Sequence, residues 1–392
     1  MRSTLSNLLI TPVLHLLFIF PLCSEVAQAS IIEVLIGDVS FAPISIDLDN
    51  PLAATNIGGM VHVAGQHEGQ AARQLIDLAT GAVHQIDLFE SLLSAPGLGE
   101  STEGQINGAA LLPDGTVIYV GQSAGLLSVD QPTYWFDPKV PIEQFTSVGT
   151  SASGLLAAVS DNGTFVGISG GGGAPAYGDP SSRNFSLLPG FTIAGIRDIS
   201  HDSQYIVGGD LIWQMNDLGG YNVLSTSDFD FSGSGIMPSF IGVAIDPLVG
   251  DAVFAGSYFD LNTFSSRVGF WRSDGTFIGA TIDGTTFRDF EVWEGQLVAA
   301  VTDFDDSFLY AISDFSMISL ENILGAKSVI YENGLFVGSA GFLASGTNGA
   351  FLTTHTTSDP NADQGGTEVP EPMTATLLGL GLLLLGKKRV IQ

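Results

Sequence analysis

The sequence predicts an all-β protein in which small antiparallel sheets are added side by side. Its composition is the first observation: glycine is abundant, at 49 of 392 residues, while only 14% of the chain is charged. Such a composition is typical of short strands joined by tight turns. The second observation is a hairpin phrase that recurs along the chain. The third is length, because the stretch between the two ends is large for one ordinary core.

The recurring phrase is an apolar pair, then usually Asp or Asn with Gly, then an alternating apolar strand that ends in a small residue. Asn-Gly and Asp-Gly supply the positive φ angles of a tight turn, so each copy predicts a β-hairpin. The seven copies end at Gly65, Gly121, Gly167, Gly208, Gly256, Ala300 and Gly338.

These small residues lie about 45 residues apart, which is the length of one four-stranded propeller blade. Seven phrases therefore predict a β-propeller-like body of about seven blades over residues 30–354. A further copy, Asp274 to Gly279, falls midway between two others and fits the second hairpin of a blade. The alternative is an array of two-sheet β-sandwiches, which would use the same strands and turns.

The N-terminal end predicts export. Residues 1–29 contain a cation at Arg2, an apolar core and the small-x-small sequence Ala27-Gln28-Ala29. This pattern is typical of a signal peptide that signal peptidase cuts, so the mature chain is expected to begin at Ser30. Cleavage there also removes Cys23, the one cysteine of the chain, so the exported body is expected to have no disulfide.

The C-terminal segment, residues 369–392, has three parts. Val369-Pro370-Glu371-Pro372 is expected to be extended, because proline restricts φ and removes a backbone donor. Residues 373–386 predict a single hydrophobic helix that is short for a permanent membrane span. Lys387-Lys388-Arg389 would then stop transfer on the cytoplasmic side. Residues 355–368 have no large apolar side chain and are expected to form a flexible linker.

This three-part tail resembles the PEP-CTERM sorting signal of exported bacterial proteins. The resemblance implies processing by an exosortase-like membrane transpeptidase after a transient stay in the inner membrane, which the hydrophobic helix would enter. It also implies a final place in the cell envelope, on the outer surface or in an extracellular matrix that contains polysaccharide. The hairpin phrases of the body are similar to HAF-type extracellular repeats, through Val268-Gly269-Phe270-Trp271 and Asn348-Gly349-Ala350-Phe351-Leu352.

The exported body is strongly acidic. The whole chain has a formal net charge of −29, and removing both signals leaves a body of about −31. This charge argues against nucleic acid as a partner, since phosphates require Lys and Arg. No cofactor is predicted, although weak Ca²⁺ binding is compatible with the acidic clusters Asp228-Phe229-Asp230-Phe231 and Asp303-Phe304-Asp305-Asp306. The alternative for both clusters is a solvated strand edge with its phenylalanines directed inward.

The sequence contains no pattern from which a catalytic residue can be chosen. His62 and His67 lie on either side of a glycine turn, where a metal pair is conceivable but solvated histidines are usual. Two Gly-x-Ser-x-Gly strings, around Ser123 and Ser169, lack the following helix that a nucleophile elbow needs. The tryptophans are expected to pack between neighbouring blades, with a sugar-stacking platform as the alternative. They are Trp135, Trp213, Trp271 and Trp293.

Together these features predict a non-enzymatic exported protein with a structural or binding role in or on extracellular polysaccharide. The alternative is a carbohydrate-active propeller hydrolase or lyase that carries the same sorting tail. One observation would separate them: a folded body that gathers two carboxylates with raised pKa values in a pocket favours the enzyme.

Overall fold

The computed structural model describes most of the body of the chain. The predicted signal peptide, the predicted linker, the predicted sorting segment and the seventh hairpin phrase, at 331–338, lie outside the described residues. The described residues are 40–44, 46–57, 59–77, 80–91, 103–124, 130–136, 143–144, 154–169, 174–181, 185–190, 195–231, 238–293, 295–324, 341–346 and 349–354.

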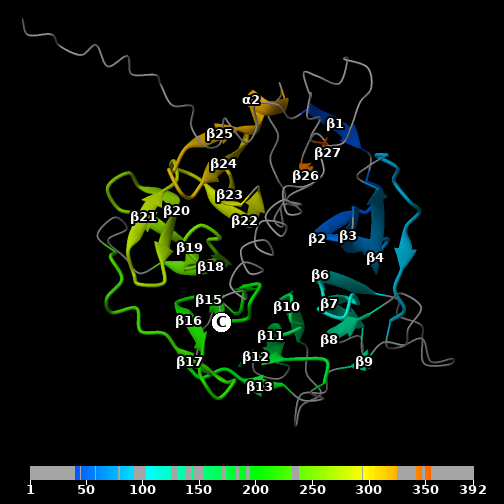
Figure 1. The fold of residues 1–392 in the computed structure, drawn as a ribbon, viewed down its shortest axis with the longest axis horizontal. Coiled ribbons are helices and arrows are strands. Elements are labelled where there is room, and N and C mark those ends of the chain that lie inside the picture. Colours follow the sequence, from blue (N-terminus) through cyan, green and yellow to red (C-terminus); the bar gives the residue numbers. More distant parts are fainter. Residues whose placement is uncertain are drawn as a thin grey trace, which may run out of the picture.

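Six four-stranded antiparallel sheets are arranged in a ring, so the body is a β-propeller (Figure 1). Within each blade the strands follow chain order, and the first strand lies nearest the centre of the ring. Blade 1 has β2 (Asn50–Ile57), β3 (Met60–His67), β4 (Gln70–Asp77) and β5 (Asp87–Leu88). Blade 2 has β6 (Gly104–Leu111), β7 (Val117–Ala124), β8 (Asp130–Trp135) and β9 (Glu143–Gln144). Blade 3 has β10 (Leu155–Val159), β11 (Phe165–Ser169), β12 (Ala174–Gly178) and β13 (Ser186–Leu187).

The second half of the ring repeats this arrangement. Blade 4 has β14 (Asp198–Ile199), β15 (Tyr205–Gly208), β16 (Leu211–Met215) and β17 (Tyr221–Val223). Blade 5 has β18 (Ser239–Ile245), β19 (Ala252–Asp260), β20 (Ser265–Arg272) and β21 (Phe277–Ala280). Blade 6 has β22 (Thr286–Trp293), β23 (Gln296–Thr302), β24 (Ser307–Ala311) and β25 (Met317–Ser319). The short helix α2 (Leu320–Leu324) follows β25.

The predicted number of seven blades is wrong, because the described residues form six four-stranded blades. The strands after the seventh phrase, β26 (Gly341–Gly346) and β27 (Gly349–Thr354), do not form a four-stranded sheet of their own. They pair instead with β1 (Ser40–Ile44) in a three-stranded sheet that lies between blades 6 and 1 (Figure 1). Since Ser40 is paired with Thr354, the two ends of the body meet on this sheet.

The other six hairpin phrases lie where the sequence predicts, each at the turn between the first and second strands of a blade. Gly115 and Gly163 both have a φ of 86° at such turns, a conformation that glycine adopts without steric cost. The Asp274 copy is the turn between β20 and β21, which confirms it as the second hairpin of blade 5.

Antiparallel pairing places the turns on two faces of the ring. The turns between first and second strands and between third and fourth strands share one face, which we call the upper face. The hairpins between second and third strands share the opposite, lower face with the connections from one blade to the next.

Glycines end most of the phrases for a packing reason. Gly65, Gly121 and Gly167 pair with the inner-strand residue just before a β-bulge, and an added Cβ would lie 2.0, 1.9 and 2.1 Å from a carbonyl oxygen of that strand. At Gly208 an added Cβ would lie 2.3 Å from Gly195 O, before β14, and at Gly256 it would lie 2.8 Å from the Pro238 side chain. In blade 6, Val301 pairs with Phe287 before the bulge, and Ala300 pairs with Asp289 after it. The structural counterpart of these glycines in blade 6 is therefore Val301, one residue after the Ala300 that the sequence pattern indicated.

Three tryptophan indoles join neighbouring blades, which confirms the predicted packing for Trp135, Trp213 and Trp271. The burial of all four excludes an exposed sugar platform at these residues. All four indoles are buried, with at most 3% of each residue exposed. Three of them lie on third strands and donate a hydrogen bond to the segment after the fourth strand of the preceding blade. These bonds run from Trp135 Nε1 to Glu90 O at 3.1 Å, from Trp213 Nε1 to Pro189 O at 2.7 Å and from Trp271 Nε1 to Asp230 O at 2.8 Å. Among the described residues, no helix has both the length and the apolar character to cross a bilayer.

Candidate functional sites

Two blades carry the same arginine–aspartate pair on their inner strands. Ile196-Arg197-Asp198-Ile199 in blade 4 corresponds to Phe287-Arg288-Asp289-Phe290 in blade 6. In each copy the carboxylate accepts a hydrogen bond at 2.8 Å from the backbone N–H of the residue that follows it. The Asp198 carboxylate also accepts a bond at 2.9 Å from Val243 N–H, on the inner strand of blade 5.

The carboxyl groups of Asp198 and Asp289, on two inner strands, both have raised pKa values. Burial raises the pKa of Asp198 to about 6, against the lowering effect of the backbone donors Val243 and Ile199. Burial, and then the charges of Glu291 and Asp198, raise the pKa of Asp289 well above its usual range. Both residues are half-buried as a whole, and loss of hydration at their carboxyl groups is the main cause of the raised pKa values.

His201 adds a cationic group to this set. It lies at the first turn of blade 4, with Nδ1 3.7 Å from Asp161 Oδ1 at the equivalent turn of blade 3. The contact with Asp161 raises the pKa of His201, and burial opposes this effect. The negative charges of Asp161, Glu291 and Asp198 raise the pKa of His201 further. More than half of each side chain in the His201–Asp161 pair is exposed, so solvent screening keeps this pair weak. Asp198, His201, Asp289 and Glu291 are called the inner acid cluster below.

The sequence analysis did not single out the inner acid cluster. A detectable signal was present, because the Arg-Asp pair recurs between apolar residues at one blade position. An open pocket lined by Gln214 to Asp217 and Asn222 to Ser225 lies between β16 and β17, away from this cluster.

The structure separates the two histidines that were considered as a metal pair. His62 Nδ1 lies 2.6 Å from the Tyr119 hydroxyl, which also accepts a bond at 2.9 Å from Arg73 Nη1. Burial and the nearby Arg73 charge lower the pKa of His62 to about 4. His67 Nδ1 instead faces Asp49 Oδ1 at 3.7 Å. Within the described ranges, no three His, Cys, Asp or Glu residues are grouped as metal ligands.

The Gly-x-Ser-x-Gly serines lie on strands. Ser123 on β7 is 1% exposed, and its Oγ lies 2.9 Å from Thr133 Oγ1 on β8. Ser169 is the last residue of β11. Residues 125–129 and 170–173, which follow these two strands, lie outside the described residues.

The two acidic clusters differ in where their phenylalanines point. Phe229 is 7% exposed and packs against Phe254 and Phe240, as expected for an inward aromatic. Phe304 is 95% exposed at the turn between β23 and β24, so the inward expectation is wrong there. The Asp303 carboxylate accepts bonds from the N–H groups of Asp305 and Asp306, at 2.7 and 2.8 Å. These bonds shape the turn and direct the intervening side chain outward.

Phe304 is one of five exposed apolar side chains on the lower face of blades 5 and 6. They lie on the β19–β20 hairpin, the connection between the two blades and the β23–β24 turn. We call these three segments the blade 5–6 edge, and its exposed apolar members are Phe259, Leu261, Phe264, Ile282 and Phe304.

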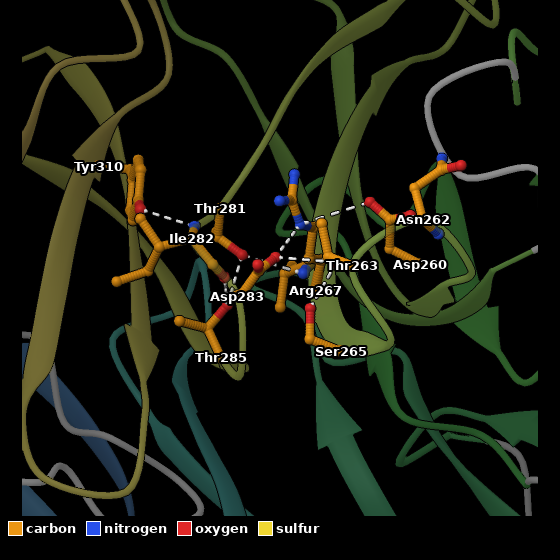
Figure 2. Close-up of polar contacts among 11 residues, drawn as sticks. Asp260, Asn262, Thr263, Ser265, Arg267, Thr281, Ile282, Asp283, Thr285 and Tyr310 are labelled. Atoms are coloured by element: carbon orange, nitrogen blue, oxygen red, sulfur yellow. Dashed lines mark hydrogen bonds and ion pairs between the residues drawn. The ribbon is translucent and has the colours of Figure 1, made fainter.

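A polar network supports this edge (Figure 2). Arg267 Nε donates to Asp283 Oδ1 in the blade connection and lies 3.6 Å from Asp260 Oδ2. Thr263 Oγ1 donates to Asp283 Oδ1 at 3.2 Å. Ile282 N–H donates at 3.2 Å to the hydroxyl of Tyr310, on β24 of blade 6 (Figure 2). The network therefore joins the β19–β20 hairpin, the connection and blade 6.

Comparison with known proteins gives the fold class. No protein-family model and no curated protein matches the sequence. A solved structure of YCF48 bound to D1 peptide is similar to this chain, with a TM-score of 0.52 at 12% identity, over 81% of this chain and 95% of that one. The β-propeller domain of Cps50 (Swd1) from Myceliophteria thermophila has a TM-score of 0.48 at 11% identity, over 81% of this chain and 99% of that one. The likeness to YCF48 agrees with the ring of blades: the chain is a β-propeller protein.

Proposed function

We propose that this chain is an exported, non-enzymatic β-propeller that binds or scaffolds other molecules in the cell envelope, where it is associated with extracellular polysaccharide. The PEP-CTERM-like tail delivers it there through an exosortase-like transpeptidase. The observation that carries this proposal is the pairing of Ser40 with Thr354. Because the body begins and ends on one sheet, a leader and a sorting tail both connect at one point of the ring.

The sorting motif provides the test. Changing Pro370 and Pro372 to alanine keeps residues 373–389 as apolar and as cationic as before, so membrane partitioning should persist. The change frees φ at both positions and spoils an extended fit to a processing enzyme. In its native host, we expect the double variant to accumulate uncut in the inner membrane. The wild type should lose the segment after the motif and reach the polysaccharide fraction.

Membrane fractionation and the mass of the C-terminal peptide measure both outcomes. Pro360→Ala in the linker is the matched control, since it removes a proline outside the motif. If wild type and double variant keep the same full-length tail, the motif is only a linker and the sorting part of the proposal is wrong.

The inner acid cluster favours a second candidate function, a carbohydrate-active hydrolase or lyase. Two carboxyl groups with raised pKa values, Asp198 and Asp289, lie on inner strands of the same ring, and the charge of Asp198 helps to raise the pKa of Asp289. A carboxylic acid that stays protonated near pH 6 can act as a general acid toward a glycosidic oxygen.

This candidate predicts an activity with a defined pH dependence. Reducing ends or unsaturated uronates released from the host's exopolysaccharide would be measured across pH. If Asp198 is the acid, activity is present below pH 6 and falls as the pH rises through about 6, where the group loses its proton. Asp198→Asn should abolish activity, while Asp228→Asn on an exposed loop should not. Absence of any release by wild type would exclude the enzyme for this polysaccharide.

A further inference from the structure

The blade 5–6 edge exposes apolar side chains that the fold itself does not use. Phe264 is 77% exposed and Phe304 is 95% exposed, and Phe259, Leu261 and Ile282 also reach solvent. They come from three segments on the lower face of two neighbouring blades. Large exposed apolar side chains gathered on one face of a domain are typical of interaction sites.

Phe264 combines exposure with backbone strain. Its φ is 56°, and its N–H donates at 2.8 Å to Asp260 O in the turn that joins β19 to β20. A bulky residue is rare at positive φ, where glycine would avoid the steric cost. Burial and backbone geometry therefore do not explain why this position is a phenylalanine. A contact between Phe264 and a binding partner would explain it.

The edge is held in a fixed shape before any partner arrives. Gly284 N–H donates at 2.7 Å to Ser266 O, which joins the blade connection to β20. Arg267 holds Asp283 beside the same hairpin, and Tyr310 holds the connection against blade 6 (Figure 2). A surface that is already ordered loses less conformational entropy on binding.

The charge of this edge indicates the chemistry of its partner. Carboxylates outnumber cations at the surface of this edge, because Asp283, Asp303 and Asp305 reach solvent along with Arg267, while Asp260 and Asp306 are buried. We propose that the blade 5–6 edge is a docking surface for a basic segment of another protein, one that presents Lys or Arg beside apolar side chains. Its apolar residues would pack on the exposed phenylalanines, and its cations would approach the carboxylates.

Other occupants fit less well. A second copy of the chain would bring two acidic edges together, and an anionic membrane surface would be repelled. A polysaccharide is usually held by aromatic platforms with many hydrogen-bonding groups. Leu261 and Ile282 offer aliphatic contacts that suit protein side chains better. Peptide binding at this edge is independent of the sorting tail, so its absence would leave the predicted tail processing unaffected.

The test is selection of short random peptides displayed on phage against the full-length chain without its signal peptide. We expect enriched peptides to combine Lys or Arg with aromatic or aliphatic residues. Their affinity, measured by fluorescence anisotropy, should fall by about tenfold or more in Phe264→Gly/Phe304→Ser, a change equal to ~1.4 kcal/mol or more. This double variant changes no charge, and glycine fits the φ of 56° at position 264.

The matched control is Leu218→Ser/Leu248→Ser, which removes two exposed apolar side chains, 95% and 57% exposed, from the upper face. It should bind the selected peptides as the wild type does. If the first double variant does not fold, the single change Phe304→Ser at the turn tip makes the same comparison. The proposal is overturned by failure to enrich peptides, by enrichment of acidic peptides, or by equal affinity of the two double variants. Stronger retention of neutral dextran or of anionic vesicles than of peptides would also overturn it.

Discussion

Trp271→Ala is expected to lower the free energy of unfolding by about 3–5 kcal/mol, the range for removal of a large buried aromatic side chain. The indole is fully buried and has ring centroids 5.3 Å from Phe277, 5.9 Å from Phe231 and 6.1 Å from Phe240. It also donates the bond that joins blade 5 to the segment after blade 4. The variant therefore loses packing inside a blade and a connection between two blades.

Urea unfolding followed by far-UV circular dichroism measures this effect. Trp271→Phe should be intermediate, because it keeps an aromatic ring but not the N–H donor. Leu218→Ala is the surface control, since a side chain that is 95% exposed should change stability by less than about 0.5 kcal/mol. If Trp271→Ala unfolds at the same urea concentration as this control, the indole does not support the ring as described.

Gly121→Ala is expected to destabilise the protein by about 3 kcal/mol or more, at or beyond the upper end of ordinary overpacking. The added Cβ would lie 1.9 Å from Gln105 O and 2.9 Å from Ile106 Cα. Both atoms belong to the backbone of β6, so no side chain can rotate away to make room. The inner strand of blade 2 must move, which disturbs its bond from Asn107 Nδ2 to Leu156 O in blade 3.

Thermal unfolding of Gly121→Ala and of the control variant Gly220→Ala measures this loss of stability. Gly220 lies in the β16–β17 turn, where an added Cβ would meet its nearest atom at 3.5 Å, an ordinary contact. That variant should stay within about 0.5 kcal/mol of wild type. Equal stability of the two variants would mean that the inner-strand bulge is not the reason for the glycine at position 121.

Local patterns in the sequence predicted much of this fold. The Asp-Gly and Asn-Gly turns identified the first hairpin of blades 2 and 3 because positive φ is a local requirement. The spacing of about 45 residues between phrases then predicted four strands for each unit. Trp135, Trp213 and Trp271 were expected to pack between blades, and their hydrogen bonds to the preceding blade confirm this.

The blade count could not be obtained in this way. A phrase identifies a hairpin, but it does not state which strands complete the sheet. The strands after Gly338 pair with β1, which is separated from β27 by the whole body. This pairing is a long-range property of ring closure, and no local periodicity reports it.

The candidate sites were missed for two different reasons. Asp198 and Asp289 belong to one electrostatic cluster because blades 4 and 6 face the same centre, although they lie in separate repeats of the chain. Phe304 was expected to point inward because strand residues next to carboxylates often alternate. Its actual direction follows from the turn that Asp303 forms with Asp305 and Asp306.

The β-hairpins, the repeat length, the acidic character of the body and the packing of Trp135, Trp213 and Trp271 between blades were all predictable from the amino-acid sequence. These features depend on local φ preferences, side-chain volume and composition, which act over a few residues at a time. The number of blades, the closing sheet, the effect of Asp198 on Asp289 and the exposure of the blade 5–6 edge became visible only in the folded ring. Those properties depend on which distant strands become neighbours, and neighbours are chosen by burial and hydrogen bonding across the whole ring.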